Sequence, residues 1–149
     1  MQNSRAIVVR QMTLADVDAV HQIETLSITP PWTKQGFVDG LANANAKFYV
    51  AERNQIVGYC GLYFAADEGE ITNVAVSPEC RGRGIADAII EHVLMDTCVM
   101  GLSQIFLEVR ASNIPAQGLY QKHGFVSQGI RKNFYREPKE DAIVMMYER

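Results

Sequence analysis

The stretch Val74–Ala86 constrains this chain most, because it joins an apolar strand to a helix through a loop that carries two glycines. Apolar residues end the strand, Pro78 interrupts it, and apolar residues recur about four apart from Ile85 onwards. Gly82 and Gly84 let successive backbone N–H groups turn toward one point, where the new helix adds its positive end. The loop therefore predicts a binding site for a phosphate or pyrophosphate.

The composition is that of a globular protein. Of the 149 residues, 48% are hydrophobic and 21% are charged, which is typical of one folded domain spanning residues 1–149. The net charge of −3 gives no basic field that would attract nucleic acid. Cys60, Cys80 and Cys98 form no metal-ligand or disulfide pattern, so we expect reduced thiols, no metal and a cytoplasmic protein. No long apolar run suggests a signal peptide or a membrane span.

Hydrophobic periodicity and turn residues predict an α+β fold. We expect helices over about 14–23, 33–42, 85–100 and 114–123, and strands over 6–9, 47–52, 56–64, 70–76, 104–110, 125–131 and 141–148. A polar loop at 133–140 should join the last two strands, and Glu24 should lie near the solvent edge of the first helix. A helical crossover joins 70–76 to 104–110, so these strands should be parallel neighbours in a largely antiparallel sheet flanked by about four helices.

Two common phosphate-binding loops do not match the glycine loop. A G-x-G-x-x-G motif would need a third glycine at position 87, which is Asp87, and the chain has no G-x-x-x-x-G-K-[ST] motif. A dinucleotide-binding Rossmann unit and a P-loop NTPase are therefore not supported.

The hexapeptide Arg81–Ala86 resembles the Q/R-x-x-G-x-G/A signature with which the GNAT family of N-acetyltransferases holds the pyrophosphate of acetyl-CoA. Leu107–Asn113 is similar to the family's next strand, and Leu119–Phe125 to its helix-to-Gly-Phe junction. Within the family, Arg131–Tyr135 and Pro31–Thr33 resemble the bacterial RimI group, as does Glu140–Met145; members of that group acetylate the N-terminal amine of a ribosomal protein. The resemblance implies a GNAT fold whose parallel strand pair splays apart at the cofactor site.

Acetyl transfer to an amine needs a proton acceptor, a stabilised thioester oxygen and a proton for the leaving thiolate. The resemblance implies that Glu108, on the opposite strand face from Leu107 and Val109, is the base, acting through water, and that Tyr120 is the acid. It also implies that acetyl-CoA is bound by Val74, Ala75, Val76, Arg81, Gly82, Arg83, Gly84, Ile85, Ala86 and Asn113, mainly through backbone groups.

Three further residues are expected beside the acceptor peptide: Trp32 in the early proline loop, and Arg131 and Tyr135 late in the chain. Two of the site assignments, that of Trp32 and that of the cofactor residue Asn113, have alternatives that the sequence leaves open. Trp32 is equally well explained as a packed anchor of its loop. Asn113 is equally well explained as a helix cap.

The sequence thus predicts an acetyl-CoA-dependent N-acetyltransferase for a protein N-terminal α-amine, with the N-terminal alanine of ribosomal protein S18 as the expected acceptor. One alternative is a GNAT enzyme for a small amine or a lysine side chain. Another is a non-catalytic module that binds CoA. A monomer or weak homodimer is expected, with no direct contact to nucleic acid or membrane.

Overall fold

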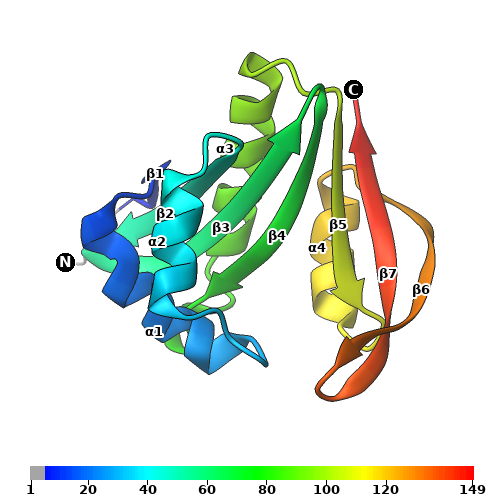
Figure 1. Cartoon of the computed structure of the whole chain (residues 1–149), viewed down its shortest axis with the longest axis horizontal. Helices are drawn as coiled ribbons and strands as arrows, with labels where there is room; N and C mark the ends of the chain where they lie inside the picture. The colour runs from blue at the N-terminus through cyan, green and yellow to red at the C-terminus, as the bar shows by residue number, and fades with distance from the viewer. Residues whose placement is uncertain (1–5) are drawn as a thin grey trace.

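A computed structural model describes residues 6–149 as a seven-stranded sheet in the spatial order β1-β2-β3-β4-β5-β7-β6 (Figure 1). Every neighbouring pair is antiparallel except β4 and β5, which confirms the predicted mixed, largely antiparallel sheet. The strands are β1 (Val8–Gln11), β2 (Ala46–Arg53), β3 (Gln55–Ala65), β4 (Glu68–Val76), β5 (Gln104–Arg110), β6 (Val126–Arg136) and β7 (Lys139–Glu148).

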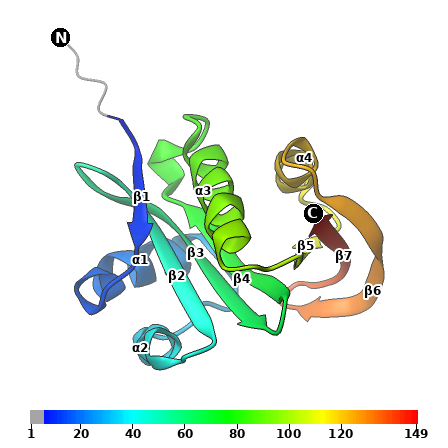
Figure 2. The ribbon, with the colours of Figure 1, turned by 90° about the horizontal axis from the view of Figure 1, so that it is seen from above.

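Helices cover both faces of the sheet. The helices α1 (Val17–Ser27) and α2 (Lys34–Ala42) lie on one face, and α3 (Ile85–Val99) and α4 (Ile114–Lys122) lie on the other (Figure 2). Two side chains begin helices as the sequence suggests. The Thr33 hydroxyl accepts the Gly36 N–H at 3.0 Å, and the Asn113 side chain accepts the Ala116 N–H at 3.1 Å.

The parallel pair β4–β5 is joined over only four residues, Glu68–Ile71 opposite Gln104–Leu107. In β4 a bulge lies at Thr72, because Ile71 faces Leu62 of β3 and Asn73 faces Gly61. A bulge bends the strand and increases its twist, so the rest of β4 leaves β5 (Figure 1). Meanwhile β5 stays paired with β7 to its end. The predicted splay is therefore confirmed, and the bulge is its physical cause.

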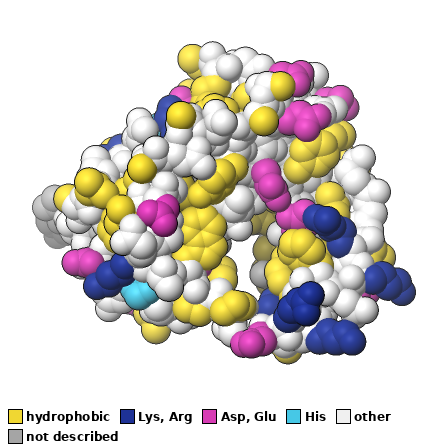
Figure 3. Space-filling model, viewed as in Figure 1, with side chains coloured by type: hydrophobic (Ala, Val, Ile, Leu, Met, Phe, Trp, Pro, Cys, Tyr) yellow, Lys and Arg dark blue, Asp and Glu magenta, His cyan; other side chains and the backbone are white. Residues whose placement is uncertain are grey.

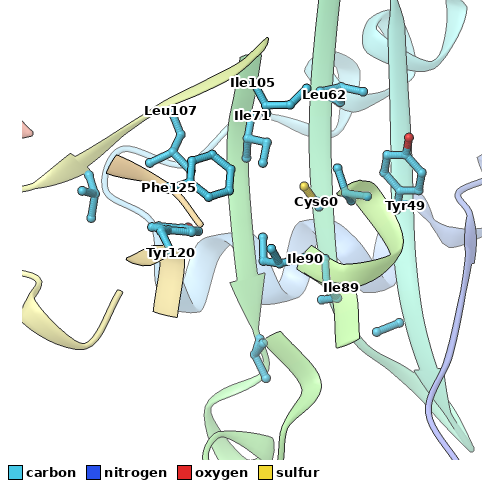
Figure 4. Close-up of a cluster of buried hydrophobic side chains, with 14 of the residues drawn as sticks. Tyr49, Cys60, Leu62, Ile71, Ile89, Ile90, Ile105, Leu107, Tyr120 and Phe125 are labelled. Carbon is cyan, nitrogen blue, oxygen red and sulfur yellow. The ribbon is translucent and has the colours of Figure 1, made fainter. Parts of the chain in front are cut away.

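Two hydrophobic clusters hold the helices against the sheet. One lies under α1 and α2 and includes Phe37, Phe48 and Tyr59. The other lies under α3 and α4 and runs from β2 across to β7, with Ile71, Ile90, Leu107, Tyr120 and Phe125 among its buried members (Figure 4). Because it contacts strands on both sides of the splay, this second cluster connects two parts of the sheet that share few ladder hydrogen bonds.

The C-terminal hairpin differs from the prediction. Residues 133–140 are not a loop: β6 continues to Arg136 and β7 begins at Lys139. A register shift between Arg131 and Tyr135 absorbs extra residues of β6, and Asn133 there has a φ of 55°. The Asn133 N–H donates to the Asp141 carboxyl at 2.8 Å. This irregular, polar strand lacks the alternation on which strand prediction depends, which explains the error.

Candidate active site

A cavity of about 270 Å³ opens where β4 leaves β5 (Figure 3). Its walls are the loop between α1 and α2, the bulge and following residues of β4, the end of β5, the start of α4, and one residue of β6. The predicted site residues that line it are Trp32, Val74, Glu108, Asn113, Tyr120 and Tyr135. Residues of five different elements or loops therefore meet at the splay.

Glu108 lies on β5 with its side chain 15% exposed. Its Oε2 atom accepts a hydrogen bond from Nη1 of Arg131 on β6 at 3.0 Å. The guanidinium balances the carboxylate charge and fixes its direction. Arg131 itself lines a second cavity, which Glu108 also borders, so its contact with an acceptor peptide stays a prediction.

Tyr120 reaches the cavity from α4 and is 5% exposed. Its ring packs edge-on against Phe125, with the ring centroids 5.7 Å apart (Figure 4). Burial raises the pKa of the phenol well above its usual value, and the nearby Cys60 and Tyr135 add to this effect. The hydroxyl is therefore protonated at neutral pH, which is the form that a proton donor requires.

The glycine loop lies at the carboxyl end of β4. Gly82 and Gly84 have φ angles of 77° and 79°, and no atom lies within 4 Å of the position of a Cβ at either residue. Glycine is thus required by backbone conformation, and the space beside it is open. Arg81 ties the loop to its surroundings: Nε donates to the Val76 carbonyl and Nη2 to the Ser27 hydroxyl, both at 3.2 Å.

Trp32 and Asn113 have structural contacts that support the alternatives left open by the sequence. The Trp32 ring packs against Phe37, Phe48 and Tyr63, with centroids 5.3, 6.0 and 6.4 Å away. It is thus an anchor of its loop, although it also lines the cavity. Asn113 caps α4 and lines the cavity as well, so its two roles are compatible.

Glu24 lines the same cavity and was missed by the sequence analysis. The expectation that it lies at the solvent edge of α1 is wrong, because it is completely buried. One carboxyl oxygen accepts the Trp32 backbone N–H at 3.0 Å, and the other accepts the Tyr59 hydroxyl. A signal was available: Val17, Val20 and Glu24 are spaced three and four apart, which places them on one helix face. Burial raises the pKa of Glu24, and the Trp32 hydrogen bond opposes that rise.

The buried Glu24 predicts a pH dependence of stability. Its folded-state pKa lies above the unfolded value of about 4.3. Protonated Glu24 therefore contributes stability below that pH, and the contribution is lost as the pH rises through the folded-state pKa. Glu24→Gln cannot ionise, so its free energy of unfolding should fall less than that of wild type as the pH rises. Urea unfolding between pH 4 and 8 measures this, and parallel curves for the two proteins would contradict it.

None of the helices within residues 6–149 combines the length and hydropathy that a membrane span requires. Over the same range, no group of three or more His, Cys, Asp or Glu side chains is arranged to hold a metal ion.

Comparisons with known proteins agree with the fold. Residues 17–125 match the model of the acetyltransferase (GNAT) family. Over 139 residues, the chain is 42% identical to a candidate [ribosomal protein bS18]-alanine N-acetyltransferase of Bacillus subtilis (strain 168), covering 92% of both chains. It is 29% identical to the [ribosomal protein bS18]-alanine N-acetyltransferase of Escherichia coli (strain K12), covering 92% of this chain and 94% of the relative. The crystal structure of the Escherichia coli ribosomal-protein-S18-alanine N-acetyltransferase aligns with a TM-score of 0.89 at 27% identity, over 96% of this chain and 94% of that one.

Proposed function

Because the chain belongs to the GNAT family of acetyltransferases and is an acetyl-CoA-dependent N-acetyltransferase, we propose that its acceptor is a protein N-terminal α-amine, that of the alanine of ribosomal protein bS18. The observation that carries this proposal is the cavity at the splay, which both Glu108 and Tyr120 line. Both parts of the sheet supply the site, so the proposal treats residues 1–149 as one catalytic domain. A ribosomal protein as acceptor implies a cytoplasmic enzyme.

The glycine loop fits the pyrophosphate of acetyl-CoA. Gly82 and Gly84 leave open space beside a backbone with positive φ, and α3 begins immediately afterwards at Ile85. The N–H groups of this turn and the positive end of a 15-residue helix suit an anion. Beyond the bulge, no strand among the described residues pairs with Val74–Val76 on the β5 side. Its free backbone groups would bind the rest of the cosubstrate and orient the acetyl group toward Glu108.

Glu108 would accept a proton from the amine, and Tyr120 would donate one to the leaving thiolate. An α-ammonium has a pKa of about 8, so a carboxylate acting through water is a sufficient base near neutral pH. The hydrogen bond from Arg131 holds Glu108 in place for this. The protonated phenol of Tyr120 would give its proton to the leaving thiolate. Holding amine and thioester together in one cavity makes the transfer effectively intramolecular.

The acceptor would enter between the α1–α2 loop and the β6–β7 hairpin, and Arg110 connects these two rims. Its Nη2 atom donates to the Glu137 carbonyl at 2.9 Å and to the Thr29 carbonyl at 3.5 Å. Its guanidinium also stacks on Tyr135, 4.2 Å from the ring centroid. Trp32 and Tyr135 therefore line the cavity from anchored positions, between which an acceptor peptide would be held.

An acetyl-transfer assay tests the proposal. We expect a peptide with the bS18 N-terminus to be acetylated at its α-amine, and the same peptide with a blocked N-terminus and an added internal lysine to be inert. Polyamines should also be inert. Preference for lysine or polyamine would establish the alternative acceptor class. Binding of CoA without product from any of these amines would support the non-catalytic module and overturn the proposal.

A further inference from the structure

Glu108 borders two cavities. The second cavity has a volume of about 450 Å³. It is lined by residues of β3, β4, β5, β6 and β7, and among the described residues Glu108 alone lines both cavities. In Figure 3 acidic and basic side chains gather at the edge of the hollow between the two parts of the molecule. The carboxyl that faces the acceptor thus also borders a separate, open space.

Glu70 lies in that second cavity beside Glu108. In the parallel register of β4 and β5, Glu70 is opposite Phe106, so Glu108 is its diagonal neighbour on the same face. The two carboxyls therefore face the same cavity from adjacent strands. Two carboxylates placed this close disfavour double ionisation, so the pair tends to keep one proton.

The groups around the pair favour that shared proton. Partial loss of solvation raises the pKa of Glu70, and the charge of Glu108 and the hydrogen bond to it raise it further, while Arg131 lowers it. Glu70 is exposed and lines the second cavity. The other titratable groups facing Glu70 are Tyr63 on β3, its antiparallel partner, and Glu68 on β4. Arg131 bonds Glu108, so the proton is held on the Glu70 side.

The reaction must release a proton. When acetyl-CoA acetylates an α-ammonium, the nitrogen loses two protons, one of which ends on the thiol of CoA and the other in water. Glu108 holds the second proton. Once the acceptor fills the first cavity, Glu108 cannot release this proton to water through that cavity. The second cavity offers an exit that neither substrate occupies in the proposed function, on which this inference rests.

We propose that Glu70 is a positioning residue for catalysis that shares a proton with Glu108 and passes the amine's proton to water in the second cavity. As Glu108 accepts a proton from the amine side, Glu70 releases the one it holds, so the pair keeps one proton throughout. No bond other than O–H and N–H bonds changes in this relay. The proton left on Glu108 then passes to Glu70, which restores the ionised Glu108 for the next turnover without opening the acceptor cavity.

Two substitutions of Glu70 test the relay. Glu70→Gln can still donate a hydrogen bond to Glu108 but cannot release a proton, so kcat should fall about tenfold while KM for peptide and acetyl-CoA stays within about twofold. The kcat of Glu70→Ala should fall by a similar factor. Added formate should restore it, because formate can occupy the space that the side chain leaves. Formate should not rescue Glu70→Gln.

Glu68→Gln is the matched control, because Glu68 lines the same cavity but is opposite Gln104, two residues farther from Glu108 along the strand. It should retain the kcat and pH profile of wild type. The relay is overturned if both Glu70 variants turn over like wild type, or if Glu68→Gln loses as much activity as they do. Wild-type enzyme that acetylates no N-terminal peptide would instead refute the proposed function, so the two failures are distinguishable.

Discussion

Glu108→Gln is expected to lower kcat about 100- to 1,000-fold, the usual contribution of a positioned general base. The amide has the size of the carboxyl and can still accept the hydrogen bond from Arg131, but it cannot take a proton from the amine. The backbone around position 108 should not move, because Leu107 and Val109 are buried and β5 remains paired with β7. Steady-state transfer to the bS18 N-terminal peptide measures the effect.

Affinity for acetyl-CoA provides the internal check on this variant. Calorimetric titration should give the same Kd for wild type and Glu108→Gln, since the glycine loop is untouched. Glu148→Gln is a suitable control, because Glu148 accepts only the Gln104 side chain at the far end of β5 and should turn over normally. If the Glu108→Gln enzyme works within twofold of wild type, Glu108 is not the base.

Tyr120→Phe is expected to lower kcat about 100-fold, because it removes the proton offered to the leaving thiolate. The substitution deletes only the hydroxyl. The ring contact with Phe125 and the packing under α4 remain, so the thermal midpoint should change little. The raised pKa of Tyr120 also means that wild-type activity should not fall from phenol ionisation between pH 7 and 9. Peptide acetylation measured across this range checks both statements.

Tyr147→Phe supplies the comparison for Tyr120. Tyr147 packs against the same Phe125, with ring centroids 5.7 Å apart, but does not line the cavity. Loss of its hydroxyl should leave kcat unchanged. Equal activity of the two Phe variants would show that the Tyr120 hydroxyl takes no part in transfer.

The features predicted correctly depend on short stretches of sequence. The glycines of the 81–86 loop, the proline that ends β4 and the periodicity of α3 act over a few residues, and they lead directly to the crossover that makes β4 and β5 parallel. The splay needed more than a local pattern. The bulge at Thr72 that causes the splay is visible only in the pairing with β3. At the level of sequence, the splay was predicted from the family resemblance alone.

The features that were missed arise between segments distant in sequence. Arg131 reaches Glu108 across 23 positions, and Tyr59 reaches Glu24 across 35. Glu70 is separated from Glu108 by the whole of α3, and only the parallel register brings them together. From sequence alone, a charged residue is usually predicted to be exposed. Glu24 can be buried because a backbone N–H and a hydroxyl donate hydrogen bonds to its carboxyl.

The departure of β4 from β5 determines which extended molecules can pair with the sheet. Sheet edges with free N–H and C=O groups normally invite pairing with other molecules, and proteins cover or interrupt them. Here one such edge, along Val74–Val76, faces the inside of the molecule across from β5. A second protein cannot easily reach it, but a narrow ligand with amide groups can. The pantetheine arm and a peptide terminus are both of this kind, so the substrates would serve as the short strand that the sheet lacks.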